Sequence, residues 1–118
     1  MNELIGKIAS ILYEKKAQDI VALDVSGMTV ITDGMVIASG RSALQVKTLA
    51  DEVEDRLSES GISPLRKEGQ QEGRWVVLDY GSVLVHIFHT QEREFYQLER
   101  LWESGENRIA LPFEAVED

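Results

Sequence analysis

The sequence predicts an α/β protein: a single domain with one mixed β-sheet of about five strands and flanking helices. Three observations predict this class. Short apolar runs of strand length alternate with longer segments in which apolar residues recur at helical spacing. The chain has 118 residues, a length that suits one domain. No internal repeat or linker interrupts the pattern, so all segments are expected to share one core.

The first helix is predicted near the N-terminus, where apolar residues form one stripe: Leu4, Ile5, Ile8, Ile11 and Leu12. Two short apolar runs follow, at residues 19–25 and 35–39. Each run is bounded by residues that favour turns, the loop SGMT after the first and Gly40 after the second. We therefore predict two strands here.

The second helix has the clearest start in the sequence. Ser42 and Gln45 fit a capping box, in which two side chains bond to free backbone amides at the helix N-terminus. An apolar stripe follows: Val46, Leu49, Ala50, Val53 and Leu57. Gly61 is expected to end this helix, and a short edge strand is expected within residues 64–69.

The stretch WVVLDYGSVLVHIFH, residues 75–89, predicts two strands joined by a two-residue turn at Gly81 and Ser82. The register then pairs residues across the turn: Tyr80 with Val83, Asp79 with Leu84, Val77 with His86, and Trp75 with Phe88. Side chains alternate between the two faces. One face is apolar and is assigned to the core: Val76, Leu78, Tyr80, Val83, Val85 and Ile87. The other face is mixed: Trp75, Val77, Asp79, Leu84, His86 and Phe88.

This mixed face is the main candidate for a functional surface. Aromatic area beside a few polar groups is typical of a protein interface. The alternative is a second core face, covered by helices, in which Asp79 pairs with His86 to offset the cost of burial.

Thr90 is expected to cap the last helix, and Gly105 is expected to close it. Its predicted buried stripe consists of Phe95, Leu98, Leu101 and Trp102. We place the boundary of the domain at residue 105. Residues 106–118 are expected to form a loosely held acidic tail that contains a small apolar group: Ile109, Leu111 and Phe113.

Composition limits the classes of function. The net charge is −9, with 21 acidic and 12 basic residues, and no basic cluster suggests direct sequence-specific binding of nucleic acid. Such a charge suits a basic protein surface, or serves solubility alone. No cysteine is present, which excludes disulfides and thiolate chemistry. Without a membrane-length apolar run or signal-peptide features, the protein is expected to be cytoplasmic and to bind no membrane.

Catalytic and metal sites are not expected. His86 and His89 lie three apart on a strand, so their side chains point to opposite faces and do not converge on a metal. His89 is placed instead at the helix entrance, as a local hydrogen-bond partner. Nucleotidyltransferases hold metals with a D-x-D pair, and neither Asp24 nor Asp33 has the second carboxylate. Serine-hydrolase and nucleotide-binding glycine motifs are missing as well. No cofactor is therefore expected.

Five blocks together resemble the ribosomal silencing factor family, also called the Iojap-like family: DIVALDV, ITDGMVIASGRS, VKTLADEVED, EGRWVVLDYGSVLVHIF and EREFYQLERLW. The resemblance runs over residues 19–102. It implies a nucleotidyltransferase-like fold without that chemistry. It also implies a partner, the large ribosomal subunit, bound through the large-subunit ribosomal protein numbered fourteen. Binding there would block joining of the small subunit. Gly34 and Met35 depart from the bulkier residues frequent in the family.

The two lines of reasoning give one set of expected partner-binding residues: Trp75, Asp79, His86, Phe88, Glu92 and Tyr96. An acidic stripe of Glu92, Glu99 and Glu103 on the last helix would suit a basic ribosomal protein, or is simply a solvated face. The predicted function is translational repression without catalysis. Two alternatives stay open, a large-subunit assembly factor and a degenerate nucleotidyltransferase-like nucleotide-binding module. Free sheet edges make a homodimer possible.

Overall fold

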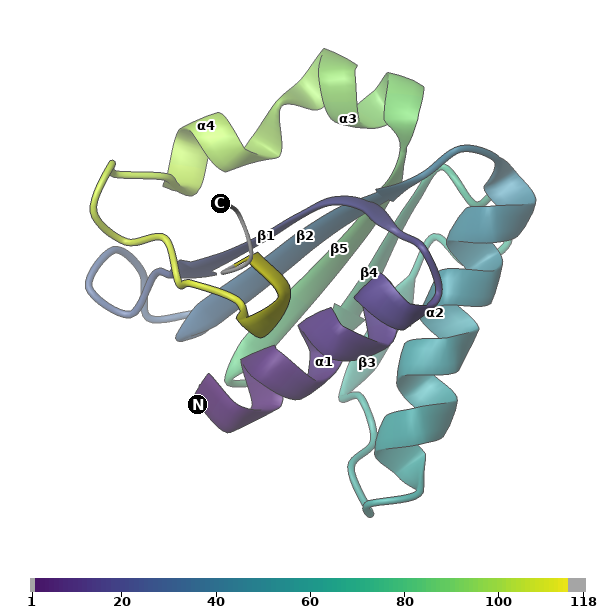
Figure 1. Ribbon diagram of the computed structural model, residues 1–118, viewed down its shortest axis with the longest axis horizontal. Helices are drawn as coiled ribbons and strands as arrows, with labels where there is room; N and C mark the ends of the chain where they lie inside the picture. The colour runs from purple at the N-terminus through teal and green to yellow at the C-terminus, as the bar shows by residue number, and fades with distance from the viewer. Residues whose placement is uncertain (1, 115–118) are drawn as a thin grey trace.

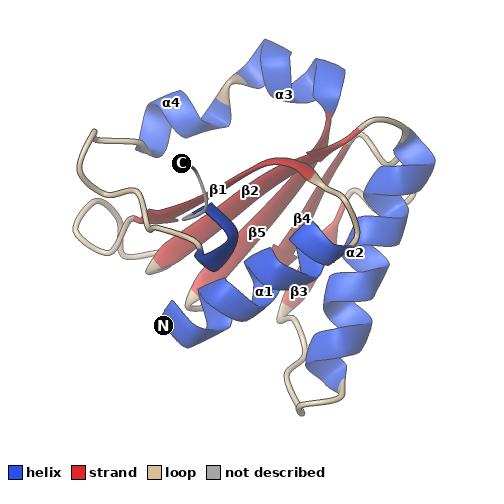
Figure 2. Cartoon of the chain, viewed as in Figure 1, coloured by secondary structure: helices blue, strands red, loops and turns tan. Residues whose placement is uncertain are grey.

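The computed structural model describes residues 2–114 and contains one mixed five-stranded sheet (Figures 1 and 2). Its strands are β1 (Gln18–Asp24), β2 (Gly34–Gly40), β3 (Arg66–Glu68), β4 (Trp75–Asp79) and β5 (Val83–His89). Their spatial order is β1-β2-β5-β4-β3. Only β2 and β5 run parallel, and the other neighbours are antiparallel. The predicted fold class is confirmed.

Helices cover both faces of this sheet. On one face lie α1 (Asn2–Glu14) and α2 (Ala43–Ser58), whose apolar stripes bury the main core against β1, β2, β4 and β5. On the other face lie α3 (Thr90–Tyr96) and α4 (Leu98–Trp102), over a smaller core. A short 3₁₀ turn, Pro112–Glu114, ends the described chain. The helices found among residues 2–114 are all too short or too polar to cross a lipid bilayer.

The ends of α2 show how local sequence sets this scaffold. The Ser42 hydroxyl accepts a hydrogen bond from the Gln45 amide at 3.0 Å. Gln45 Oε1 accepts from the amide of Arg41 at 2.6 Å. A capping box would use the amide of Ser42, the next residue. At the other end, Ile62 N–H donates to Leu57 and Gly61 N–H donates to Ser58. Gly61 has a φ of +79°, so this is a Schellman motif and the predicted glycine stop is confirmed.

The hairpin has the predicted register. Trp75 pairs with Phe88, Val77 with His86, and Asp79 with Leu84. The Tyr80 amide donates to Val83 at 2.9 Å across the turn. The predicted apolar face, apart from partly buried Tyr80, is fully buried in the main core.

The prediction of one continuous helix at the end of the domain is wrong. Gln97 adopts left-handed backbone angles (φ 49°, ψ 50°) and divides the segment into α3 and α4. The break resets the helical phase, so Phe95 and Leu101 are 79 % and 72 % exposed, against the prediction. Leu98 and Trp102 do pack on the smaller core, as predicted. The N-cap is His89 and not Thr90, because His89 Nδ1 accepts from the Gln91 amide at 3.2 Å.

The described part of the tail is attached firmly, which corrects the expectation of a loose segment. Asn107 C=O accepts from Asp24 N–H, and Ile109 N–H donates to Ala22, both at 2.8 Å. Leu111 is buried, and the Phe113 ring stacks on Tyr13 with centroids 4.2 Å apart. Residues 115–118 lie outside the described residues, and the domain boundary at residue 105 stays a prediction.

The departure at Gly34 and Met35 has a packing reason. A Cβ added at Gly34 would lie 2.6 Å from Cδ1 of Ile5, so the glycine leaves room for this side chain of α1. Met35 points to the other face and is 3 % exposed in the smaller core. Gly34 therefore makes room for α1 on one face of the sheet, and Met35 packs in the core on the other face.

Candidate protein-binding site

Aromatic rings gather where β4, β5 and α3 meet, and we call Trp75, Phe88, Phe95 and Tyr96 the aromatic cluster. Trp75 and Phe88 are cross-strand partners, and their rings stack with centroids 4.7 Å apart. Because α3 starts directly after β5, it returns over the sheet and brings Tyr96 to 5.0 Å from Trp75. Phe95 meets the edge of Tyr96 at 4.9 Å. The cluster thus joins two strands to one helix.

Exposure rises steadily across the aromatic cluster. Phe88 is fully buried and Trp75 is partly buried, whereas Tyr96 is 50 % and Phe95 79 % exposed. Phe88 was expected to contact a partner, but its burial makes it a support beneath the surface. Phe95 was expected in the core and is the most exposed ring of the four. No signal in the sequence indicated that Phe95 would be exposed, since its exposure depends on the left-handed conformation of Gln97.

Trp75 is held in place by His86. The indole N–H of Trp75 donates to His86 Nδ1 at 3.1 Å. A nitrogen that accepts carries no proton, so the imidazole proton is on Nε2. That atom is buried and has no hydrogen-bond partner among residues 2–114. Burial lowers the pKa of His86 to about 4, so the ring is neutral at pH 7. His86 therefore fixes the indole rather than offering a charge to a partner.

A glycine also shapes this site. Gly69, in the loop before β4, has a φ of +85°, and a Cβ added there would overlap the carbonyl oxygen of Trp75. The close passage of the two backbone segments requires a residue without a side chain. This loop forms one wall of a cavity of about 250 Å³ next to the aromatic cluster, lined by Gly69, Glu72, Arg74, Trp75, Glu92 and Tyr96. Of the predicted site residues, Glu92 therefore does lie beside Trp75 and Tyr96.

Asp79 lies apart from the aromatic cluster, at the opposite end of β4 from Trp75. Its carboxylate accepts from the Gly81 amide at 2.8 Å and pairs with Arg66 at 3.3 Å. It supports the hairpin turn and the edge strand β3. The alternative in which Asp79 pairs with His86 is therefore wrong, although helices do cover part of the mixed face.

The predicted acidic stripe is largely neutralised. Glu99 pairs with buried Arg93 at 3.0 Å, and Glu103 pairs with Arg108 at 3.6 Å. Glu92 Oε1 lies 3.7 Å from His89 Nδ1. That nitrogen already accepts from the Gln91 amide, so the contact is not a hydrogen bond. Glu92 is thus the carboxylate of the stripe that stays available beside the aromatic cluster.

Arg93 has a structural role that the sequence did not reveal. It is 9 % exposed, and its Nη1 donates to the Ser39 hydroxyl at 2.8 Å. Its Nε donates to Glu99, which lies beyond the break at Gln97. Arg93 therefore ties α3 to β2 and to α4, and so holds Tyr96 over Trp75.

The fold and the site define a single-domain α/β protein with a partly exposed aromatic surface suited to binding another protein. Comparison with known proteins then gives the family. The model of the family described as "Ribosomal silencing factor during starvation" matches residues 1–118. The chain therefore belongs to the ribosomal silencing factor family.

Individual relatives agree with this assignment. "Ribosomal silencing factor RsfS" of Bacillus subtilis is 45 % identical over 89 residues, which is 75 % of each chain. "Protein Iojap, chloroplastic" of Zea mays is 32 % identical over 107 residues, 91 % of this chain and 46 % of the plant protein. A crystal structure of a Chromobacterium violaceum protein superposes with a TM-score of 0.84 at 34 % identity, covering 93 % of this chain and 92 % of that one.

Proposed function

We propose that this protein is a translational repressor that binds the large ribosomal subunit and sterically blocks joining of the small subunit. The family is named for ribosome silencing. The observation that carries the proposal is the aromatic cluster, whose inner rings are anchored and whose outer rings are exposed. Anchored aromatic side chains with an exposed edge typically dominate the affinity of protein interfaces.

The expected partner is the large-subunit ribosomal protein numbered fourteen, at the face that meets the small subunit. The net charge of −9 favours a basic partner surface and speeds association with it. Beside the aromatic cluster, Glu72 and Glu92 outnumber Arg74. This local excess of negative charge has the same sign as the whole chain, which supports the same class of partner.

The proposed mechanism is exclusion by volume. The protein measures 34 × 32 × 31 Å along its principal axes. Subunits must approach to contact distance to join, so a body of this size at their interface prevents it. No bond is made or broken, and no cofactor takes part. The protein is expected to act in the cytoplasm, where ribosomes translate.

The first prediction concerns the partner. The protein should co-sediment with purified large subunits and not with small subunits. The reason is that the proposed binding surface is complementary to one protein of the large subunit. Binding should compete with subunit joining, so adding the protein should reduce the 70S peak in a sucrose gradient. Equal sedimentation with both subunits would contradict the proposal.

The second prediction is that no nucleotidyl transfer occurs. The Asp24 carboxylate accepts from the Ser26 amide at 3.0 Å and from its hydroxyl at 2.7 Å. These bonds lower the pKa of Asp24 and fix it in a turn. Within residues 2–114, no three acidic or histidine side chains are placed to share a metal ion. Incubation with nucleoside triphosphates and Mg²⁺ should release no pyrophosphate. Release that Asp24→Asn abolishes would overturn this prediction.

The third prediction is a homodimer, because open sheets leave edges that pair with other strands. The β3 edge is a poor candidate, since its three residues are all charged and exposed. Self-association is therefore expected to be weak. Sedimentation equilibrium at increasing concentration measures it, and a constant monomer mass would exclude a dimer.

A further inference from the structure

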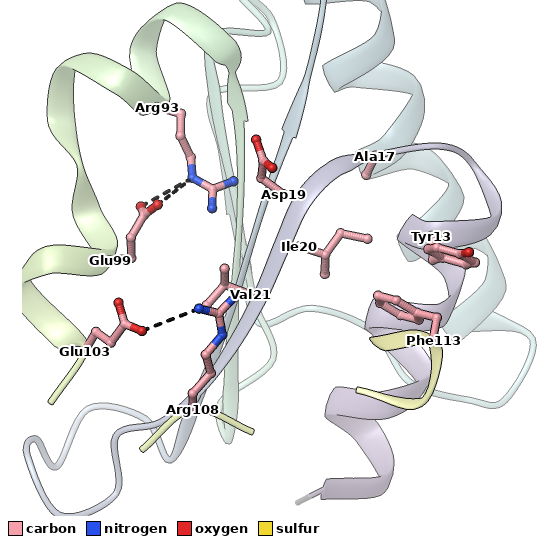
Figure 3. Close-up of a pocket in the computed structure, with 10 residues that line it drawn as sticks. All are labelled: Tyr13, Ala17, Asp19, Ile20, Val21, Arg93, Glu99, Glu103, Arg108 and Phe113. Atoms are coloured by element: carbon pink, nitrogen blue, oxygen red, sulfur yellow. Dashed lines mark hydrogen bonds and ion pairs between the residues drawn. The ribbon is translucent and has the colours of Figure 1, made fainter. Parts of the chain in front are cut away.

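The outer edge of β1 is only partly paired. The tail runs antiparallel to it, with a bridge between Leu23 and Arg108. In this short ladder, Ile109 N–H donates to the carbonyl oxygen of Ala22. Towards the start of β1, Asp19, Ile20 and Val21 line a cavity instead (Figure 3). This part of β1 lies at the edge of the sheet and has no strand partner on that side among residues 2–114.

A bulge distorts β1 at this point. From Gln18 to Val21 the strand takes three steps, while its partner takes two, from Ser39 to Ile37. Asp19 lies within the bulge and has a φ of +51°. Residues other than glycine adopt this left-handed backbone conformation at some cost in free energy. Bulges of this kind redirect a side chain at a sheet edge. Here the redirected group is the carboxylate of Asp19, which is exposed and lines the cavity.

The cavity continues as a trough on both sides of Asp19. One part has a volume of about 570 Å³ and extends to the stacked rings of Tyr13 and Phe113. A second part of about 440 Å³ extends along α3 and α4. The two parts share three lining residues: Asp19, Arg93 and Glu99. An elongated trough beside a sheet edge fits an extended chain better than a compact ligand.

The carboxylates that line the trough outnumber the guanidinium groups by one: Asp19, Glu94, Glu99 and Glu103 against Arg93, Arg100 and Arg108. Arg93 pairs with Glu99, and Arg108 pairs with Glu103, as the dashed lines in Figure 3 show. The Asp19 carboxylate has no hydrogen bond or ion pair within the described residues. A cationic side chain that reached Asp19 would give this carboxylate its partner.

We propose that the trough binds an extended, positively charged segment of a partner protein, which pairs with the edge of β1 at Ile20 and places a Lys or Arg side chain against Asp19. The trough shares α3 with the aromatic cluster, but none of the four rings lines it, so the inference does not depend on the proposed function. Nucleic acid is disfavoured as the occupant by the net charge of −9. A second copy pairing through β1 would bring two Asp19 carboxylates together.

The test uses a capped heptapeptide probe, Thr-Val-Lys-Val-Lys-Val-Thr, added to the ¹⁵N-labelled full-length protein. Amide shifts measure where it binds, at an ionic strength of about 0.15 M that screens non-specific attraction. The peptide should perturb the amides of residues 18–21. A peptide with proline in place of valine keeps the charge but cannot form a strand, so it should not bind. A peptide with glutamate in place of lysine should not bind either.

Asp19→Asn should weaken binding of the lysine peptide about fivefold, the scale of one exposed charge pair. Asparagine also adopts left-handed angles readily, so the bulge should survive. The matched control is Asp51→Asn, which removes an exposed carboxylate on α2 and should leave binding unchanged. Absence of shifts at residues 18–21, equal binding of the proline peptide, or equal losses in both variants would overturn the proposal.

Two further measurements identify other occupants. If the amides of residues 18–21 shift with protein concentration alone, a second copy fills the trough and the proposal fails. If ending the chain after Glu114 shifts the same amides and increases peptide affinity, the chain's own last residues compete for the trough. That outcome would also overturn the proposal, because it would make the trough an intramolecular site.

Discussion

Replacing Trp75 by alanine is expected to weaken binding to the large ribosomal subunit by roughly one and a half to three decades. Truncating a buried aromatic anchor typically costs about 2–4 kcal/mol of binding free energy, at about 1.4 kcal/mol per decade. Trp75 is the central ring of the aromatic cluster, since it contacts Phe88, Tyr96 and His86. Its loss removes the contact surface and the ring against which Tyr96 is positioned.

The same substitution is expected to lower the stability of the fold. Trp75 packs on the smaller core and donates a hydrogen bond to His86. Truncation of a large core ring costs at most about 3–5 kcal/mol, and a partly exposed ring should cost less. Binding must therefore be compared per folded molecule, from thermal melting and ribosome titration of the same sample.

Trp102→Ala is the matched control for this experiment. Trp102 is also a partly buried tryptophan packed on the smaller core, but it lies on α4. The Trp102→Ala variant should be less stable than the wild type but should keep its affinity for the large subunit per folded molecule. Phe95→Ala is the complementary control, because a ring that is 79 % exposed should affect binding while hardly changing the melting temperature. If Trp75→Ala and Trp102→Ala melt early and both bind normally once folded, Trp75 is a core residue only.

The hairpin shows why part of this structure could be predicted from sequence. Gly81 has a φ of +83°, and a glycine at the first turn position fixes the connection between two strands. Once the turn is fixed, alternation determines every cross-strand pair and both faces. The helix caps at Ser42 and Gly61 were likewise encoded by residues within one turn of the helix end. These features depend on local chemistry, which a single sequence displays.

The break at Gln97 shows why the rest could not be predicted. Glutamine is a good helix former, and no residue nearby signals a left-handed turn. The conformation is held by tertiary contacts, chiefly the bonds of Arg93 to Ser39 and Glu99. The contact with Ser39 joins residues 54 positions apart in the sequence. The exposure of Phe95, the pairing of Asp79 with Arg66 and the bulge at Asp19 depend on the assembled sheet in the same way.

Acidification is expected to destabilise the protein through His86. Its pKa is about 4 in the folded protein because of burial, against an ordinary value of 6.5. Between these two values the unfolded chain binds more protons than the folded one, so the free energy of unfolding falls as the pH falls. The stabilisation is fully present above about pH 6.5 and is lost towards pH 4, a change of about 3 kcal/mol at about 1.4 kcal/mol per pH unit.

The structural reason lies in the hydrogen bond to Trp75. A protonated imidazole carries N–H groups at both nitrogens, so Nδ1 can no longer accept from the indole. Protonation therefore breaks the bond that orients Trp75 and leaves a charge in the smaller core. The measurement is urea unfolding at several pH values between 4 and 7. Other carboxylates also titrate in this range, so the readout is the difference in pH dependence between the wild type and variants that cannot titrate at this position.

His86→Asn and His86→Phe serve as this pair of variants. Asparagine keeps an oxygen that can accept from the Trp75 indole, whereas phenylalanine keeps the ring and removes the acceptor. Both should be less stable than the wild type at pH 7, by different amounts. Both should nevertheless lose the same part of the pH dependence, because neither side chain binds a proton. If both variants unfold with the pH dependence of the wild type, the buried imidazole is not the group that titrates, and another group must account for the acid sensitivity.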